Sequence, residues 1–422
     1  MMRKTVAFLL AGGMGSRLNI LGWMRAKPAV PFGGSYRIID FTLTNAMRSD
    51  ISIIGILTQY RPYSLMQHIA NGEAWDMIGR KRAIKILPPS TGINDNDWYR
   101  GTADAVRQNL SFAERYDAEQ IVVLSGDHIY NMNYAPMVEF HQKQGAALTI
   151  AMMRVPWEET HHFGLAVLDD DNRIVEWQEK PKDAKTNLAS MGVYVVDYQF
   201  LKSALEKSSG HDFGKNIIPE ALKTREVYAY LFDGYWADVG TLRAYWKSNM
   251  DVLRPDSGLE LNTWKVRTNM EEEGLVGDRP PLKISRSAKV RNALVSCGCY
   301  IEGKVINSIL SPGVRVEKGA SVVDSVIMHD SLVEKNASLF EVIADKRTVF
   351  GAGCSLGNGK VERPNEKYPD HLYSGLTIVG KKAIVPPSVS LLRNTLIEPR
   401  AMAESFEDIQ FRCGSYIAKV DG

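Results

Sequence analysis

Cysteine is scarce in this sequence, with four residues in 422, and all four lie beyond position 296 (Cys297, Cys299, Cys354 and Cys413). Four cysteines are too few for a disulfide scaffold, and their spacing matches no zinc-binding or redox motif. Their positions also exclude a cysteine nucleophile from the first two-thirds of the chain. We therefore expect reduced thiols and a cytoplasmic protein.

Long apolar runs and an excess of one charge are also missing. No stretch of about 18 apolar residues occurs, which excludes a membrane-spanning helix. Lysine and arginine number 51 and the acidic residues 49, for a net charge of +2. This balance argues against a generic binder of nucleic acids or membrane surfaces. We expect neither among the partners, and any anionic ligand must be recognised by local groups.

The chain up to residue 253 alternates short apolar runs with helix-like segments, the pattern of a parallel sheet covered by helices on both faces. Strands are expected at residues 5–11, 51–57, 121–124, 147–152, 173–178 and 192–196. Helices are expected at residues 60–69, 103–116 and 134–144, and from Leu242 with Thr241 as its cap. A basic start before residues 5–11 resembles a signal peptide, but the apolar run is short for one, so we interpret it as a strand. Residues 1–253 are thus predicted to form a Rossmann-like, doubly wound α/β domain.

The pattern changes after residue 253. Residues 254–282 are rich in proline, glycine and acidic residues, as a linker would be. Beyond them apolar residues recur in steps of six, as at Val316, Val322 and Met328, with small residues between. This period is typical of a left-handed parallel β-helix, predicted here for residues 283–422, with an antiparallel sandwich as the alternative. A loop is expected where the repeat is interrupted, between Lys360 and Ser374.

The strongest motif joins a strand to the glycine-rich loop Gly12-Gly13-Met14-Gly15, followed by Arg17 and Lys27. Glycine at such a place lets backbone N–H groups approach a phosphate. The loop is neither of the two common nucleotide motifs, because Leu18 replaces the third glycine of GxGxxG and no Gly-Lys-Ser/Thr follows. Two cations beside a phosphate loop suit a pyrophosphate leaving group. We therefore assign Arg17 and Lys27 to catalysis.

Two aspartates, Asp127 and Asp238, each end a predicted strand. Open α/β sheets bind ligands at the carboxyl ends of their strands. Mg²⁺ typically takes one or two carboxylates together with phosphate oxygens. For each aspartate taken alone, a helix cap or turn residue is an equally good interpretation as a metal ligand.

Six motifs in a fixed order resemble the sugar-nucleotide pyrophosphorylase family, and within it the branch that makes ADP-glucose. They are residues 12–18 with Lys27-Pro28, 37–41, 98–105, 125–130, 188–194 and 211–215. The resemblance covers nearly the whole chain. It implies a nucleotidyltransferase domain followed by a β-helix that serves regulation or oligomerisation.

The resemblance also implies roles for single residues. It makes Asp127 and Asp238 the metal ligands, with Asp127 also catalytic. It makes Lys180 the ligand of the sugar phosphate and Glu179 the ligand of the sugar hydroxyls, although a lysine at a strand end is usually solvated. The remaining implied ligands are Tyr99, Gly164 and Ser190 for glucose 1-phosphate, and Gly12, Gly13, Gln59 and Gly101 for the nucleotide.

The reaction implied is the transfer of AMP from ATP to glucose 1-phosphate with Mg²⁺ as cofactor, which gives the glucosyl donor for glycogen or starch. The resemblance further implies a homotetramer controlled by metabolites of central carbon metabolism. Three alternatives are a pyrophosphorylase that uses UTP, dTTP or GTP, a non-catalytic regulatory subunit, and an acyltransferase based on His329 or His371. A regulatory subunit would be expected to have lost one of the catalytic residues, and all are present.

One departure from the family concerns regulation. Met24 stands where many bacterial members carry a basic residue. Arg25 and Arg37 are then the candidate ligands of a phosphorylated effector, with surface salt bridges as the alternative.

Overall fold

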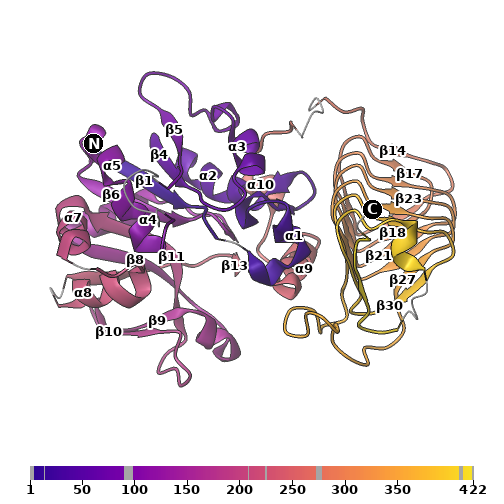
Figure 1. Cartoon of the computed structure of the whole chain (residues 1–422). Coiled ribbons are helices and arrows are strands. Elements are labelled where there is room, and N and C mark those ends of the chain that lie inside the picture. The colour runs from indigo at the N-terminus through magenta and orange to yellow at the C-terminus, as the bar shows by residue number, and fades with distance from the viewer. Residues whose placement is uncertain are drawn as a thin grey trace. The chain divides into compact units, whose positions relative to one another are not determined.

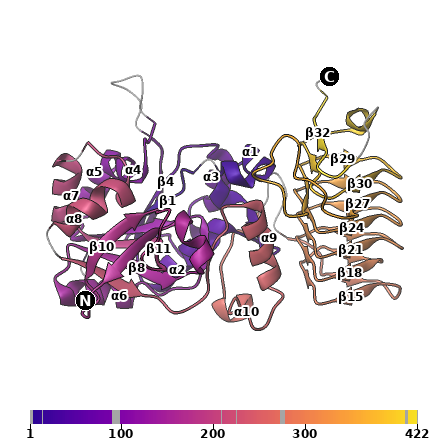
Figure 2. The same cartoon turned by 90° about the horizontal axis from the view of Figure 1, so that it is seen from below.

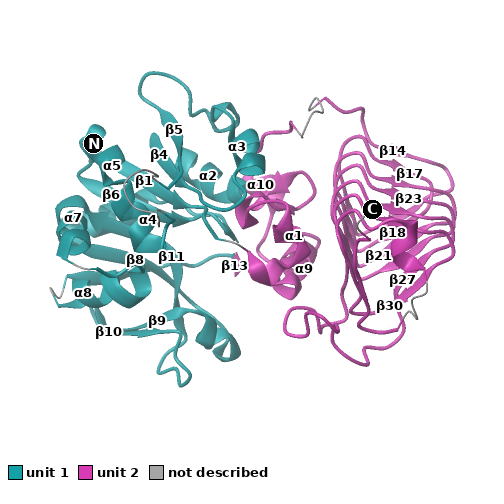
Figure 3. Cartoon of the chain, viewed as in Figure 1, with its two compact units in different colours: residues 1–13, 39–236 teal, residues 14–38, 237–422 magenta. Residues whose placement is uncertain are grey.

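The computed structural model describes residues 4–13, 15–89, 98–207, 209–223, 226–271, 278–407 and 412–420. The chain forms two compact units (Figure 3). Unit 1 comprises Met1–Gly13 and Ile39–Trp236, and unit 2 comprises Met14–Ile38 and Ala237–Gly422. Among the helices of the described ranges, none has the length and apolar character needed to cross a membrane.

A nine-stranded sheet forms the centre of unit 1, in the order β10-β9-β11-β6-β1-β4-β5, with β8 joining β11 to β12. The strands are β1 (Thr5–Leu10), β4 (Ile53–Leu57), β5 (Ala83–Leu87), β6 (Gln120–Ser125), β8 (Leu148–Arg154), β9 (Gly164–Leu168), β10 (Ile174–Glu179), β11 (Leu188–Asp197) and β12 (Val227–Leu231). The expected parallel arrangement holds for β6, β1, β4 and β5. β11 is antiparallel to β6 and β8, so the sheet is mixed. A strand buried between two neighbours has the same apolar pattern in either direction.

Helices cover the sheet of unit 1, and Figure 2 shows α4, α5, α7 and α8 on one side of it and α6 on the other. The helices are α2 (Ile38–Arg48), α3 (Tyr63–Ile69), α4 (Thr102–Gln108), α5 (Leu110–Arg115), α6 (Ala135–Gln144), α7 (Tyr198–Lys207) and α8 (Ile218–Leu222). The helix expected at residues 103–116 is in fact two helices that meet at Asn109. The core between these layers includes Phe8, Val123, Val196 and Leu201. The predicted doubly wound α/β architecture is confirmed.

Three parallel sheets build the β-helix of unit 2 (Figure 1). The first contains β14 (Lys283–Ile284), β17 (Tyr300–Ile301), β20 (Arg315–Val316), β23 (Leu332–Val333), β26 (Val349–Phe350) and β29 (Ile384–Val385). The second contains β15 (Lys289–Arg291), β18 (Lys304–Ile306), β21 (Ser321–Val323), β24 (Ser338–Phe340), β27 (Ser355–Asn358) and β30 (Ser390–Leu392). The third contains β16 (Leu294–Val295), β19 (Ile309–Leu310), β22 (Val326–Ile327), β25 (Val342–Ala344), β28 (Thr377–Val379), β31 (Leu396–Ile397) and β32 (Tyr416–Ile417).

The apolar repeat forms the interior of this β-helix. Val305 pairs with Val322, and Leu339 with Leu356, so that equivalent buried side chains lie above one another from coil to coil. The next partner of Leu356 is Leu391, because the expected loop of residues 360–374 lengthens this coil. The ladders are parallel throughout, which confirms the β-helix and rules out the antiparallel sandwich.

Unit 2 also contains segments from two earlier parts of the sequence. From the N-terminal part come η1 (Ser16–Leu18), α1 (Ile20–Trp23), η2 (Lys27–Ala29), β2 (Pro31–Phe32) and β3 (Tyr36–Arg37). From the middle come α9 (Leu242–Asp251) and α10 (Leu261–Trp264), and α10 lies inside the predicted linker. The Thr241 hydroxyl accepts a hydrogen bond from the Ala244 N–H at 3.1 Å, which confirms the predicted cap. The predicted division at residues 253 and 282 follows the change in sequence pattern. The compact units instead assign residues 14–38 and 237–253 to the unit that contains the β-helix.

Candidate active site

The glycine-rich loop follows β1 in unit 1. The Ala11 N–H donates to the Leu57 carbonyl at 2.8 Å and extends the pairing of β1 with β4 up to the loop. A Cβ atom at Gly12 would lie 3.6 Å from the Cβ of Gln59, which is ordinary contact, and no described atom lies within 4 Å of a Cβ at Gly13. Packing therefore requires glycine at neither position. Access to the backbone N–H groups is the physical reason that is left for these glycines.

Gln59 connects this region with Tyr99. Its Oε1 accepts a hydrogen bond from the Tyr99 N–H at 2.5 Å. The Tyr99 hydroxyl donates to the Leu87 carbonyl at 3.0 Å and accepts from Asn109 Nδ2 at 2.9 Å. Burial raises the pKa of Tyr99 to about 12. Because this hydroxyl already makes hydrogen bonds to Leu87 and Asn109, Tyr99 would contact a sugar through its ring or backbone.

Gly101 immediately precedes α4. A Cβ atom there would lie 2.3 Å from the His211 carbonyl oxygen, a distance that real Cβ atoms do not show. The same carbonyl accepts hydrogen bonds from the N–H groups of Ala103 at 2.9 Å and Asp104 at 3.3 Å. It thereby satisfies two amide groups at the start of the helix. This close approach accounts for the glycine, and its contact with a nucleotide stays a prediction.

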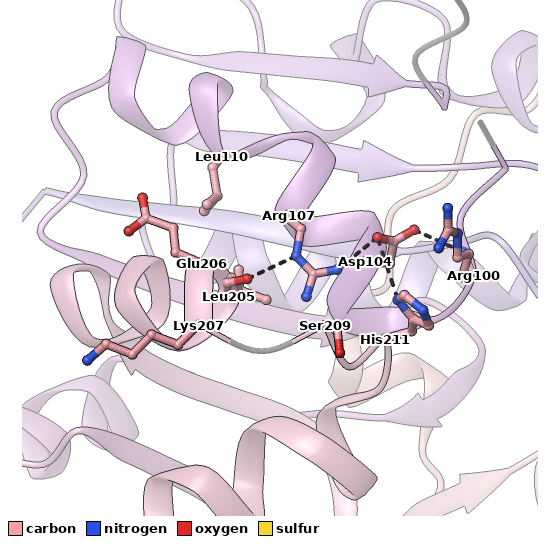
Figure 4. A pocket seen from close by; sticks show the side chains of 9 residues that line it. All are labelled: Arg100, Asp104, Arg107, Leu110, Leu205, Glu206, Lys207, Ser209 and His211. Atoms are coloured by element: carbon pink, nitrogen blue, oxygen red, sulfur yellow. Dashed lines mark hydrogen bonds and ion pairs between the residues drawn. The ribbon is translucent and has the colours of Figure 1, made fainter. Parts of the chain in front are cut away.

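Asp104 holds together the segments around a shallow groove of unit 1 (Figure 4). Its carboxylate accepts hydrogen bonds from the Arg100 N–H at 3.0 Å and from Arg107 Nη1 at 2.9 Å. Arg107 also donates to the carbonyls of Leu205 at 3.1 Å and Gly210 at 2.7 Å. The network fastens the segment that carries Tyr99 and Gly101 to the chain that leads into η5 (Phe213–Ile217).

Asp127 follows β6 at its carboxyl end, as predicted. Gly126 precedes it, and a Cβ atom at that position would lie 2.5 Å from Leu9 Cδ2, so the turn requires glycine. The Asp127 carboxylate accepts a hydrogen bond from the Ser125 hydroxyl and lies 3.5 Å from His128 Nε2. The Nδ1 of His128 lies 3.1 Å from the Met191 carbonyl. The histidine is thus oriented between a backbone oxygen and the carboxylate.

Gly164, Glu179 and Ser190 lie on three adjacent strands, because β9 stands between β10 and β11 in the sheet. Glu179 is paired directly with Gly164. A Cβ atom at Gly164 would lie 2.2 Å from Trp177 and 2.9 Å from Glu179 Oε2, and a Cβ atom at Gly214 would lie 2.2 Å from the same oxygen. Two glycines therefore make room for one carboxylate. The three adjacent strands thus bring together three of the predicted sugar ligands, Gly164, Glu179 and Ser190.

The Glu179 carboxylate and the Lys180 ammonium differ in their surroundings. Burial raises the pKa of Glu179, and the nearby Lys180 partly offsets this. Lys180 is exposed and has a φ of +48°, a left-handed conformation that costs a non-glycine residue energy. Its N–H donates to the Phe163 carbonyl at 3.1 Å, which fixes this turn. Other basic residues of the chain, such as Lys265 and Lys382, also have positive φ, so the role of Lys180 in binding the sugar phosphate stays a prediction.

Arg17, Lys27 and Asp238 come together in unit 2. Lys27 is 5% exposed, and its Nζ lies 3.0 Å from Asp238 Oδ1. A Cβ atom at Gly240 would lie 2.9 Å from Asp238 Oδ1 and 3.0 Å from Arg17 Nη2, so both groups pack against this glycine. Asp238 ends β13 (Trp236–Asp238). Two cations and one carboxylate leave a net positive charge, which favours an anionic ligand.

Asp127 in unit 1 and Asp238 in unit 2 suit the predicted metal by their chemistry. Their side chains are 30% and 20% exposed, respectively, so each remains accessible at the end of a strand. Carboxylate oxygens are hard ligands of the kind that Mg²⁺ prefers. Each residue thus fits the role of a magnesium ligand.

The two arginines predicted to bind an effector are buried. Arg25 is 2% exposed, and its Nη2 donates to both carboxylate oxygens of Asp345, at 2.9 and 3.0 Å. Arg37 is 4% exposed in β3. The alternative of surface salt bridges does not describe Arg25, because its ion pair is buried.

No role was predicted from the sequence for His128, Trp177, Asp104, Asp212 or Gly214. Asp212 caps η5 by accepting a hydrogen bond from the Lys215 N–H at 3.1 Å. All except Trp177 lie inside motifs that were recognised as units. The signal was present at those positions, but only the structure shows what each side chain contacts.

Comparisons with known proteins identify the family of the chain. The family model described as nucleotidyl transferase matches residues 6–254, and the model described as GlmU-like, C-terminal hexapeptide matches residues 281–379. Among the relatives is a glucose-1-phosphate adenylyltransferase of Acetivibrio thermocellus, 42% identical over 99% of this chain and 98% of the relative. Proteins of the same name from Fervidobacterium nodosum and Thermotoga maritima are 45% and 42% identical, over 94% and 99% of this chain and 95% and 99% of their own lengths.

The glycine-rich loop after β1, the cations that follow it in the sequence and the match of residues 6–254 to the family model define a nucleotidyl transferase. The chain belongs to the glucose-1-phosphate adenylyltransferase family of nucleotidyl transferases.

Proposed function

We propose that the protein transfers the adenylyl group of ATP to α-D-glucose 1-phosphate and releases pyrophosphate, and so supplies ADP-glucose for glycogen or starch synthesis. The observation that carries the proposal is the assembly of Arg17 and Lys27 around Asp238 in unit 2. The near full-length similarity to glucose-1-phosphate adenylyltransferases supports the choice of nucleotide and sugar.

In this reaction a phosphate oxygen of glucose 1-phosphate attacks the α-phosphorus of ATP in line. A new phosphorus–oxygen bond forms, the bond to the β-phosphate breaks, and pyrophosphate leaves with the electron pair. No nucleophile from the protein is needed, because positioning and charge neutralisation supply the catalysis. Arg17 and Lys27 stabilise the developing charge on the leaving group, and the ion pair with Asp238 orients Lys27 for this task.

The remaining ligands divide between the two substrates. Lys180 holds the sugar phosphate, and Glu179 accepts hydrogen bonds from sugar hydroxyls beside Gly164 and Ser190, with Tyr99 contributing its ring. The backbone of Gly12 and Gly13 faces the nucleotide phosphates, and Gln59 and Gly101 contribute to the same site.

We further propose Asp127 and Asp238 as the ligands of Mg²⁺. When bound, the ion neutralises phosphate charge and orients the reacting oxygens. The partly exposed carboxylates at strand ends support this assignment. The proposal also includes a cytoplasmic homotetramer under metabolite control.

Initial rates of pyrophosphate release, measured with ATP, UTP, dTTP and GTP, test the nucleotide preference. We expect ATP to give the highest kcat/KM. A higher value with any of the other three nucleotides would favour a different pyrophosphorylase, and no turnover with all four would favour a regulatory subunit. Crossing the same assay with phosphorylated metabolites identifies the effector.

A further inference from the structure

The N-terminal segment that carries Arg17 and Lys27 contacts the β-helix part of unit 2 in two places, the loop with Tyr368 and His371 and the end of β25. The ring of Trp23 makes an edge contact with Tyr368, with centroids 6.2 Å apart. Asn19 Nδ2 lies 3.4 Å from Nδ1 of His371. Arg25 pairs with Asp345 at the end of β25. Figure 3 shows α1 of this segment in the same unit as the β-helix.

The pair between Arg25 and Asp345 differs from the other two contacts because it is a completely buried ion pair. The side chains are 2% and 0% exposed. Asp345 is itself held firmly: its N–H donates to the Val379 carbonyl at 2.8 Å, and its Oδ1 accepts from the Lys346 N–H at 2.7 Å. A carboxylate that is held by a neighbouring backbone N–H group in turn holds the guanidinium in one position.

Lys27 follows Arg25 after a single residue. Ala26 is extended and 1% exposed, so the connection between Arg25 and Lys27 is short and buried. On the other side of Lys27, the carbonyl of Pro31 accepts a hydrogen bond from the Tyr245 hydroxyl at 2.5 Å. Lys27 therefore lies between two fixed points, one supplied by the β-helix and one by α9.

We propose that Asp345 is a positioning residue for catalysis, which acts through Arg25 to place the ammonium group of Lys27. This inference rests on the proposed function, in which Lys27 stabilises the leaving pyrophosphate. The β-helix thereby contributes directly to the rate of the reaction, through a side chain that contacts neither substrate.

The test is Asp345→Asn in the full-length protein, which keeps the shape of the side chain and removes its charge. We expect kcat to fall by about tenfold or more while the KM for glucose 1-phosphate changes by less than about twofold, because the sugar ligands belong to unit 1. The matched control is Asp330→Asn, since Asp330 also accepts two hydrogen bonds from one arginine, Arg279, at 2.6 and 3.1 Å. The control is expected to retain the wild-type kcat. An unchanged kcat in Asp345→Asn would overturn the proposal.

Asp345→Asn leaves Arg25 charged and buried, so the variant can lose stability for that reason alone. The double variant Arg25→Met with Asp345→Leu removes both charges and keeps apolar volume. Under the proposal its kcat stays low even where its Tm returns to the wild-type value. Recovery of kcat together with Tm would show a merely structural pair and overturn the proposal.

A double-mutant cycle with Lys27→Gln separates this inference from the proposed function. If Asp345 acts through Lys27, Asp345→Asn lowers the residual kcat of Lys27→Gln by less than about twofold. A further loss equal to that in the wild-type background would overturn the inference and leave the function intact. Wild-type turnover of Lys27→Gln alone would overturn the role of Lys27 and this inference, and would leave the adenylyl transfer itself intact.

Discussion

The ammonium group of Lys27 lies 3.0 Å from the carboxylate of Asp238, although 211 residues separate them in the chain. This pair joins two motifs that the sequence presents far apart. Under the proposed function, Asp238 has a second task besides the binding of Mg²⁺, the orientation of Lys27.

Asp238→Asn and Asp127→Asn are expected to lower kcat by at least about a hundredfold each, because each removes a charged group that acts on the reacting phosphates. Steady-state rates at saturating Mg²⁺ measure the effect, and Asp169→Asn, at a turn outside the proposed site, serves as control. Near-normal turnover of either variant would remove that aspartate from the metal site.

Lys180→Gln is expected to raise the KM for glucose 1-phosphate by about tenfold or more and to change the KM for ATP much less. One charge-assisted hydrogen bond to a phosphate has about this effect when it contributes equally in ground and transition states. Lys182→Gln, two residues away and also exposed, is the control. A larger rise in the KM for ATP would place Lys180 at the nucleotide instead.

Glu179→Gln is expected to weaken sugar binding and to change how stability depends on pH. Burial raises the pKa of Glu179 in the folded protein, so the folded state binds the proton more readily than the unfolded state. The resulting stabilisation is fully present below the ordinary pKa of glutamate and is lost as pH rises through the raised value.

The free energy of unfolding of both proteins, measured between about pH 4 and about pH 7, tests this sign. The free energy of unfolding of the glutamine variant should rise relative to that of the wild type as the pH increases. The KM of the variant for glucose 1-phosphate should be higher than that of the wild type. A variant that lost stability relative to the wild type on going to neutral pH would contradict the assigned cause of the shift.

Gly13→Ala and Gly101→Ala are expected to fail in different ways. Alanine at Gly101 would collide with the His211 carbonyl, and we expect a loss of stability of about 1–3 kcal/mol. Alanine at Gly13 meets no described atom within 4 Å, so we expect the Tm to stay nearly constant and the KM for ATP to rise. Thermal unfolding and ATP titrations of the two variants distinguish packing from ligand access. Equal losses of Tm would refute the distinction.

The sequence predicted the features that depend on local pattern. The Thr241 cap, the loop after β1 and the buried repeat positions Val316 and Val322 all follow from short-range periodicity or turn chemistry. The direction of β11 does not, because a strand buried on both faces has no directional pattern.

The partner of Arg25 was equally beyond prediction. Asp345 lies 320 residues away, and only the fold of the whole of unit 2 brings the two together. The hydroxyl of Tyr99 is a similar case, since its contacts with Leu87 and Asn109 depend on how three segments pack. The motifs identified the candidate site residues, and the tertiary structure determines which groups these residues contact.

The long coil between Leu356 and Leu391 shows that the β-helix tolerates growth at one level without disturbance of the next. Each coil pairs only with its immediate neighbours, so extra residues that leave and re-enter at the same height cost the stack little. The loop of residues 360–374 is nevertheless fastened to the last coils, because the buried Asn365 donates from Nδ2 to the carbonyls of Asn394 and Ser415. A change in the length or chemistry of this loop would therefore act on Asn19 and Trp23, in the segment that leads to Lys27.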